Sequence, residues 1–233
     1  MKKLCPHCNI EMEHHDVKQA EECWALYKSV ETAEQITAEL IARCDVSPMF
    51  GKHTFKNSDR EIMLENAIAW GQARSWVESD ATCFYLYGIP GTGKTYAARC
   101  VLHDAMVSST RDNPYVSVVE ISAYKMLKDT MGFGPIVDYV NARLEQCQYL
   151  MIDDIDKPDW NPKSIAFLWN LLNERSNRGG RVIITTNVEP DKFRDIFSGA
   201  AIDNASRLDA TIERLAPVTT AHFKGKTLRR MAL

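Results

Sequence analysis

The sequence of 233 residues predicts an α/β protein in which helices flank a parallel sheet. Short apolar runs at residues 83–87, 149–152 and 181–187 have the length and composition of buried strands. Stretches of helical periodicity separate these runs, as in sheets whose strands are parallel. Each run also ends in glycine or polar residues, and parallel strands place their functional groups at that edge.

Composition sets limits on what the chain does. The 45% hydrophobic content is ordinary for a globular protein, and 28 basic residues nearly balance 31 acidic ones, so no overall field favours nucleic acid. Seven cysteines suit a reducing compartment better than a disulfide framework. No signal peptide and no apolar run of membrane-spanning length occurs. We therefore expect a cytoplasmic protein with no membrane partner.

Residues 1–44 are expected to form a small zinc-binding and helical module. A C-x-x-C knuckle, Cys5 and Cys8, is half of a tetrahedral zinc site, with Cys23 and either His14 or His15 as the other ligands. The alternative is free or redox-active thiols. The helical pattern over residues 17–43 indicates an amphipathic face that serves as core or docks a partner.

Residues 45–58 lose periodicity and concentrate Pro, Gly, Ser and Asn, which indicates a linker. Phe50 and Phe55 are unusual in a solvated linker and are expected to pack on the following domain, which spans residues 59–233. That domain should begin with a helix over residues 59–78 that leads into the strand at residues 83–87.

The first strand is followed by G-x-x-x-x-G-K-T, from Gly88 to Thr95, and then by a helical segment. This order is that of a P-loop nucleoside triphosphatase, and it implies ATP and Mg²⁺ as cofactors. Lys94 would bridge the phosphates, and Thr95 would hold Mg²⁺. The alternative is that this stretch is a glycine-rich turn with no phosphate-binding role. The expected nucleotide contacts are Gly88, Ile89, Pro90, Gly91, Thr92, Gly93, Lys94, Thr95 and Tyr96.

A strand over residues 115–121, a helix capped by Ser122 and a helix over residues 136–145 come next. The apolar strand at residues 149–152, expected beside the P-loop strand, then ends in Asp153 and Asp154. Asp153 is the predicted Mg²⁺ carboxylate, and Asp154 is predicted to polarise the attacking water. The alternative is that either carboxylate only caps the next helix.

A helix over residues 165–173 precedes the strand at residues 181–187. Asn187, at the tip of that strand, is predicted to hold the attacking water near the γ-phosphate. Thr185 and Thr186 are weaker candidates, because β-branched residues suit strands in any case.

Taken together, the P-loop, the strand with Asp153-Asp154, the strand with Thr186-Asn187 and the segment Ala205-Ser-Arg-Leu resemble the AAA+ ATPases. The resemblance is strongest to the DnaC and DnaI helicase loaders and the IstB transposition ATPase, and covers residues 44–233. It implies no separate lid domain. It also implies that Arg207 is an arginine finger acting on a neighbouring subunit's ATP, with Arg214 as the second choice. Arg175 is expected either to face a neighbour's nucleotide or to lie on a solvated helix end. Asp154 stands where many AAA+ proteins have Glu, which implies slow hydrolysis.

The resemblance implies a bacterial or phage ATPase that loads the replicative DNA helicase when DNA replication starts. Its expected partners are that helicase, single-stranded DNA, and further copies of the chain or a co-assembly with the helicase. Residues 222–233 hold five potential cations, counting His222, and no acidic residue, so they are expected either to contact single-stranded DNA or to form a solvated surface. The alternatives are an IstB-like ATPase that remodels DNA, a nucleotide-binding adaptor without hydrolysis, and a small-molecule kinase.

Overall fold

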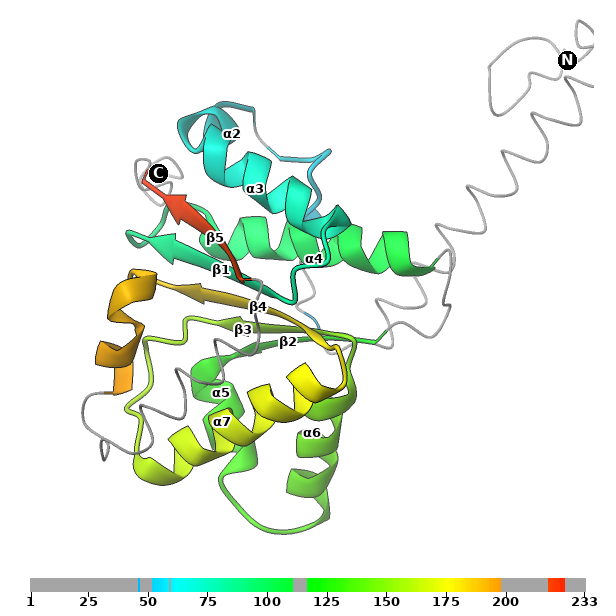
Figure 1. Ribbon diagram of the computed structural model, residues 1–233, viewed down its shortest axis with the longest axis vertical. Coiled ribbons are helices and arrows are strands. Elements are labelled where there is room, and N and C mark those ends of the chain that lie inside the picture. Colours follow the sequence, from blue (N-terminus) through cyan, green and yellow to red (C-terminus); the bar gives the residue numbers. More distant parts are fainter. Residues whose placement is uncertain (1–45, 47–51, 59, 111–116, 198–217, 225–233) are drawn as a thin grey trace, which may run out of the picture.

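The computed structural model describes residues 46, 52–58, 60–110, 117–197 and 218–224 (Figure 1). Its strands are β1 (Cys83–Gly88), β2 (Val118–Ser122), β3 (Tyr149–Asp153), β4 (Arg181–Thr186) and β5 (Val218–Phe223). The helices are α2 (Arg60–Glu65), α3 (Ala67–Glu78), α4 (Lys94–Thr110), α5 (Ala123–Thr130), α6 (Pro135–Gln146), α7 (Pro162–Asn177) and the 3-10 helix η3 (Pro190–Phe197).

The strands form one parallel sheet in the order β2-β3-β4-β1-β5. This arrangement confirms the predicted α/β fold. It corrects the expectation that the strand carrying Asp153 lies beside the P-loop strand, because β4 lies between β3 and β1. The carboxyl ends of all five strands still share one edge, so the groups that follow β1, β3 and β4 can meet there.

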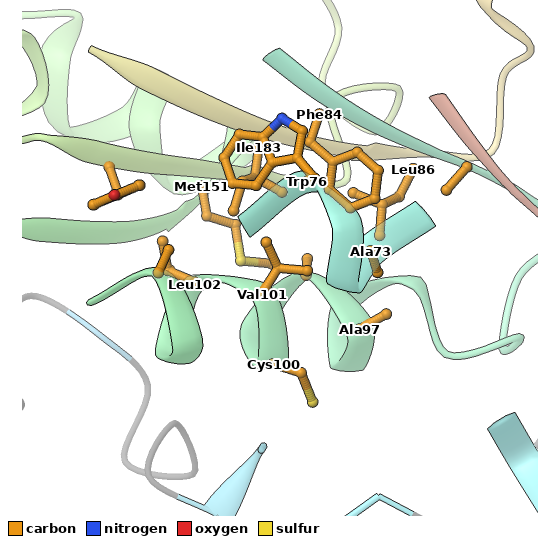
Figure 2. Close-up of a cluster of buried hydrophobic side chains, with 14 of the residues drawn as sticks. Ala73, Trp76, Phe84, Leu86, Ala97, Cys100, Val101, Leu102, Met151 and Ile183 are labelled. Atoms are coloured by element: carbon orange, nitrogen blue, oxygen red, sulfur yellow. The ribbon is translucent and has the colours of Figure 1, made fainter. Parts of the chain in front are cut away.

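Helices cover both faces of the sheet, with α3 and α4 on one face and α5, α6 and α7 on the other (Figure 1). Successive strand residues point to opposite faces, so Phe84 and Leu86 pack toward α3 and α4 while Tyr85 packs toward the second layer. In the first layer Trp76 of α3 stacks on Phe84 with ring centroids 5.5 Å apart, above Val101 of α4 (Figure 2).

Local sequence explains where several helices begin. Ser122 accepts a hydrogen bond from the Lys125 backbone N–H and caps α5, as predicted. Asn161 caps α7 through a reciprocal pair of hydrogen bonds with Ser164, so this helix begins before the predicted residue 165. The single helix predicted over residues 59–78 is two helices that meet at Asn66, whose side chain accepts from the Lys224 backbone N–H.

Two further expectations concern the linker at residues 45–58 and the basic segment at residues 222–233. Phe55 is 8% exposed and lies edge-on to Trp70 at 5.7 Å, so the linker packs on the domain as predicted, whereas Phe50 lies outside the described residues. The predicted basic segment 222–233 begins inside the sheet, because His222 and Phe223 belong to β5 and Phe223 is fully buried. Its contact with single-stranded DNA stays a prediction. Residues 225–233 lie outside the described range. No helix in the described ranges has the length and apolar character to cross a membrane.

Candidate nucleotide-binding site

A pocket of about 290 Å³ opens at the carboxyl edge of the sheet. The P-loop and the start of α4 form one wall, and the segments that follow β3 and β4 form the other. Its lining residues are Pro90, Gly91, Gly93, Lys94, Thr95, Tyr96, Asp154, Lys157 and Asn187.

Glycine is required at particular points of the P-loop. Gly88, Gly91 and Gly93 have φ angles of 137°, 83° and 96°, a region that residues with a Cβ rarely adopt. At Gly88 a Cβ would also lie 2.0 Å from the carbonyl oxygen of Phe223 in β5. The loop then passes directly into α4 at Lys94, whose first turn presents free backbone N–H groups and the positive end of the helix dipole to the pocket.

The ammonium group of Lys94 lies in the pocket wall that the P-loop and the start of α4 form, and Lys94 is only 6% exposed. Nζ donates to the carbonyl oxygens of Gly88 at 2.8 Å and Ile89 at 2.9 Å, and to Asn187 Oδ1 at 3.1 Å. Burial lowers the pKa of Lys94, while the carboxylate of Asp154 opposes that shift. The three oxygens are neutral partners, which phosphate oxygens can replace with a gain in charge-assisted bonding.

Thr95, the last residue of the P-loop motif, meets Asp153 at the end of β3. Thr95 Oγ1 donates to Asp153 Oδ1 at 2.8 Å, and Thr185 Oγ1 donates to the same oxygen at 2.5 Å. A hydroxyl and a carboxylate beside a phosphate site are the oxygen ligands that Mg²⁺ takes in combination with water and substrate phosphates. The residues present therefore fit Mg²⁺: Thr95 and Asp153 would hold it, and it would supply positive charge against the phosphates.

Asp154 lines the pocket with an unusual backbone. Its φ of 55° is left-handed, a region that Asp tolerates better than most residues, and its N–H donates to Thr185 Oγ1 at 2.9 Å. Burial and the neighbouring carboxylates of Asp153 and Asp156 raise the pKa of Asp154. A carboxylate with a raised pKa is a better proton acceptor, which suits the predicted contact with water.

Asp156 and Lys157 belong to the site although they were not among the residues predicted from the sequence. Asp156 accepts from the backbone N–H and from Nδ2 of Asn187, at 3.0 and 2.7 Å, and from Thr186 Oγ1 at 3.0 Å. Burial works to raise the pKa of Asp156, but these hydrogen bonds outweigh it and hold the pKa below its ordinary value. Lys157 lines the pocket itself. The only signal in the sequence was that both residues follow Asp154 closely at a strand end.

Other predicted residues do not reach this pocket or lie beyond the described ranges. Arg175 is fully buried and bonds backbone carbonyls, so neither of its predicted roles, at a neighbour's nucleotide or on a solvated helix end, is correct. Arg207 and Arg214 lie outside the described residues, as do the zinc candidates Cys5, Cys8, His14, His15 and Cys23. Among the described residues, no group of three or more His, Cys, Asp or Glu side chains is arranged to hold a metal ion.

A parallel sheet with a glycine loop, a buried lysine and a Thr–Asp pair at its carboxyl edge defines the class of P-loop nucleoside triphosphatases. Residues 84–211 match the profile of the ATPase family associated with various cellular activities (AAA), which is more than half of the chain. The chain belongs to this family and is an ATP-binding P-loop protein.

Solved structures share the fold at low identity. The chain is 16% identical to DnaI, covering 78% of this chain and 93% of that one with a TM-score of 0.60. It is 17% identical to the DnaC helicase loader, covering 77% and 100% with a TM-score of 0.55. For the replication initiator DnaA bound to AMPPCP and single-stranded DNA, identity is 16%, the TM-score is 0.55, and 77% of this chain covers 51% of that one. The chain likewise spans 50% of a DNA replication initiation factor. No curated protein sequence matches it.

Proposed function

We propose that the protein is an ATP-dependent loader of the replicative DNA helicase. The observation that carries this proposal is the extent of the structural likeness to DnaI and DnaC, which takes in 93% and 100% of those chains. DnaA and the replication initiation factor extend well beyond the region that this chain matches. Likeness over the full length of the solved DnaC helicase loader chain therefore supports this role over that of an initiator.

The proposed chemistry is positional and electrostatic. Thr95 and Asp153 would hold Mg²⁺, and Lys94 would exchange its carbonyl partners for phosphate oxygens. Asp154 would polarise the attacking water. Asn187 presents Oδ1 toward Lys94, so this oxygen can accept a hydrogen bond from that water once Lys94 turns to phosphate.

The remaining parts of the site would come from outside the described residues. We propose that Arg207 reaches the γ-phosphate bound by a neighbouring copy, because the planar guanidinium makes paired bonds to phosphate oxygens. Mixing Lys94→Ala with Arg207→Ala protein tests this. Partial recovery of ATPase activity is the expected result, since a shared site would pair one intact P-loop with one intact arginine. If no activity returns, the sites are not shared.

The domain division is part of the same proposal. Residues 1–44 would be a zinc-bound module that docks on the helicase, joined by residues 45–58 to the ATPase domain of residues 59–233. Zinc content of the purified full chain, compared with a Cys5→Ser, Cys8→Ser double variant, tests the metal. One equivalent in the wild-type protein and loss in the variant are expected, and metal-free wild-type protein would contradict the assignment.

Capture of the host's replicative helicase tests the function. The full chain should retain the helicase, and a chain that begins at Asp45 should lose it, because the docking module is removed. Unchanged capture by the shorter chain would refute docking through residues 1–44. Failure of the full chain to capture any helicase, together with ATP-dependent binding of double-stranded DNA, would instead favour an IstB-like transposition ATPase.

A further inference from the structure

A continuous line of contacts crosses the floor of the nucleotide pocket. Lys94 Nζ donates to Asn187 Oδ1 at 3.1 Å, and Asn187 Nδ2 donates to Asp156 Oδ2 at 2.7 Å. Lys157 Nζ lies 3.4 Å from the same Asp156 oxygen. A cation therefore stands at each end of the line, and both cations line the pocket.

The orientation of the Asn187 amide follows from its neighbours. An ionised carboxylate only accepts and an ammonium only donates, so Nδ2 must face Asp156 and Oδ1 must face Lys94. The reversed amide would set like groups against each other at both ends. Asp156 therefore fixes which atom of Asn187 faces the pocket, and it places Lys157 beside the same residue.

The two cations are held differently. Lys94 is 6% exposed and has three close oxygen partners, whereas the Lys157 side chain is 52% exposed and, among the described residues, is paired with Asp156 at 3.4 Å. Asp156 already accepts hydrogen bonds from Thr186 and from Asn187, so it stays satisfied if Lys157 moves away. Because the Lys157 end of this ion pair is exposed and lies 3.4 Å from its partner, the pair contributes little, and its ammonium can turn to a new anion at small cost.

We propose that Lys157 is a second phosphate-binding cation that recognises the γ-phosphate of ATP from within the same chain. This inference rests on the proposed ATP site. The backbone N–H groups of the P-loop and the start of α4 form the wall for the inner phosphates, and Lys157 lies on the other wall with Asp154 and Asn187. A cation on that wall meets the terminal phosphate, which ADP lacks.

Two residues are thus proposed to detect the γ-phosphate in different ways. Arg207 is proposed to act between copies, so its effect depends on assembly. Lys157 would let a single chain distinguish ATP from ADP before any partner binds. Discrimination should then be the same at protein concentrations that favour single chains and at those that favour assemblies.

Equilibrium binding of AMPPCP and ADP to the full-length protein, each with Mg²⁺, tests the proposal. Lys157→Ala should weaken AMPPCP binding about tenfold, or about 1.4 kcal/mol, and ADP binding less than about twofold. Lys157→Arg should keep most of the AMPPCP affinity. Lys163→Ala is the matched control, because this exposed lysine lies six positions further along the chain, in the first turn of α7, and does not line the pocket; it should change neither affinity.

Equal affinity of Lys157→Ala and wild-type protein for AMPPCP would overturn the proposal, as would equal weakening of AMPPCP and ADP. Lys94→Ala separates this failure from failure of the ATP site. If Lys94→Ala loses both nucleotides while Lys157→Ala binds normally, only the role of Lys157 is wrong. If Lys94→Ala binds both nucleotides normally, the ATP site itself is misplaced.

Discussion

Replacing Arg175 by methionine should destabilise the fold without acting on catalysis directly. Arg175 is fully buried in α7 and has no carboxylate among its hydrogen-bond partners in the described structure. Nη1 donates to the carbonyl oxygens of Leu144 and Cys147, both at 2.8 Å, and Nη2 donates to Arg181 O at 2.8 Å and Gln148 O at 3.3 Å. One guanidinium thus joins the end of α6 to the entrances of β3 and β4.

The expected loss of unfolding free energy comes from the backbone carbonyls that Arg175→Met leaves without a hydrogen-bond partner. Breaking a buried polar network costs about 3–5 kcal/mol, because each buried acceptor left without a partner costs about 1–3 kcal/mol. Methionine recovers part of this cost by filling space and by removing a charge that burial disfavours, as the lowered pKa of Arg175 indicates. A net loss of about 3 kcal/mol is expected, or about 6–12 °C in Tm for a chain of this size.

Urea unfolding of the nucleotide-free protein measures this loss directly. Arg178→Met is the matched control, since Arg178 lies one turn later, is exposed, and should change stability by less than about 0.5 kcal/mol. A loss below about 1 kcal/mol for Arg175→Met would refute the assignment of Arg175 as a structural link. Near-normal stability with ATPase activity that recovers on mixing with Lys94→Ala protein would instead place Arg175 at a shared site.

Three further predictions concern the site and its support. Gly88→Ala should lower the free energy of urea unfolding by about 3 kcal/mol, because its Cβ would lie 2.0 Å from Phe223 O. Gly71→Ala is the control and should be neutral or stabilising, since its Cβ would meet nothing within 4 Å, and equal stability of the two variants would contradict the proposed clash. Asp153→Asn should raise the Mg²⁺ concentration that half-saturates ATPase activity by about tenfold or more, and an unchanged requirement would exclude Asp153 as a ligand. Burial and carboxylate neighbours raise the pKa of Asp154, so kcat should fall on acidification at a higher pH than for an ordinary aspartate. Lys157→Ala removes a cation that lowers this pKa, so it should move the fall in kcat to still higher pH. A pH profile that the substitution does not move would count against this electrostatic coupling.

The nucleotide-binding half of the fold could be predicted because its signals are local. The P-loop glycines, the helix after Lys94 and the strands ending in Asp153 and Asn187 each occupy a contiguous stretch in which composition and spacing agree. The structure brings Lys94, Thr95, Asp153 and Asn187 together as those stretches indicated.

The order of the strands and the existence of β5 could not be predicted from local sequence. Nothing in a strand's own sequence states which strand lies beside it, so the position of β4 between β1 and β3 depends on packing across the whole sheet. The segment Val218–Phe223 mixes threonines with a histidine and precedes a basic stretch. Its strand character comes from pairing with β1, from Cys83 opposite Val218 to Gly88 opposite Phe223.

Single residues with long-range partners were the least predictable. Arg175 reaches carbonyls as far as 31 positions away in the chain, and an isolated arginine near a helix end is normally solvated. Asp156 was equally hard to predict, because its partners Thr186 and Asn187 lie at the end of β4, 30 and 31 positions further along the chain. Only the fold brings these groups within hydrogen-bond distance.

Release of inorganic phosphate from Mg·ATP, with and without single-stranded DNA, measures whether the pocket hydrolyses ATP. The wild-type protein should show slow release that requires Mg²⁺, and Lys94→Ala and Asp154→Ala should each reduce it to background. Lys163→Ala should match wild type. If wild-type and Asp154→Ala protein release phosphate at the same near-zero rate under both conditions, the pocket binds nucleotide without hydrolysing it, and the account of this chain as an ATPase is wrong.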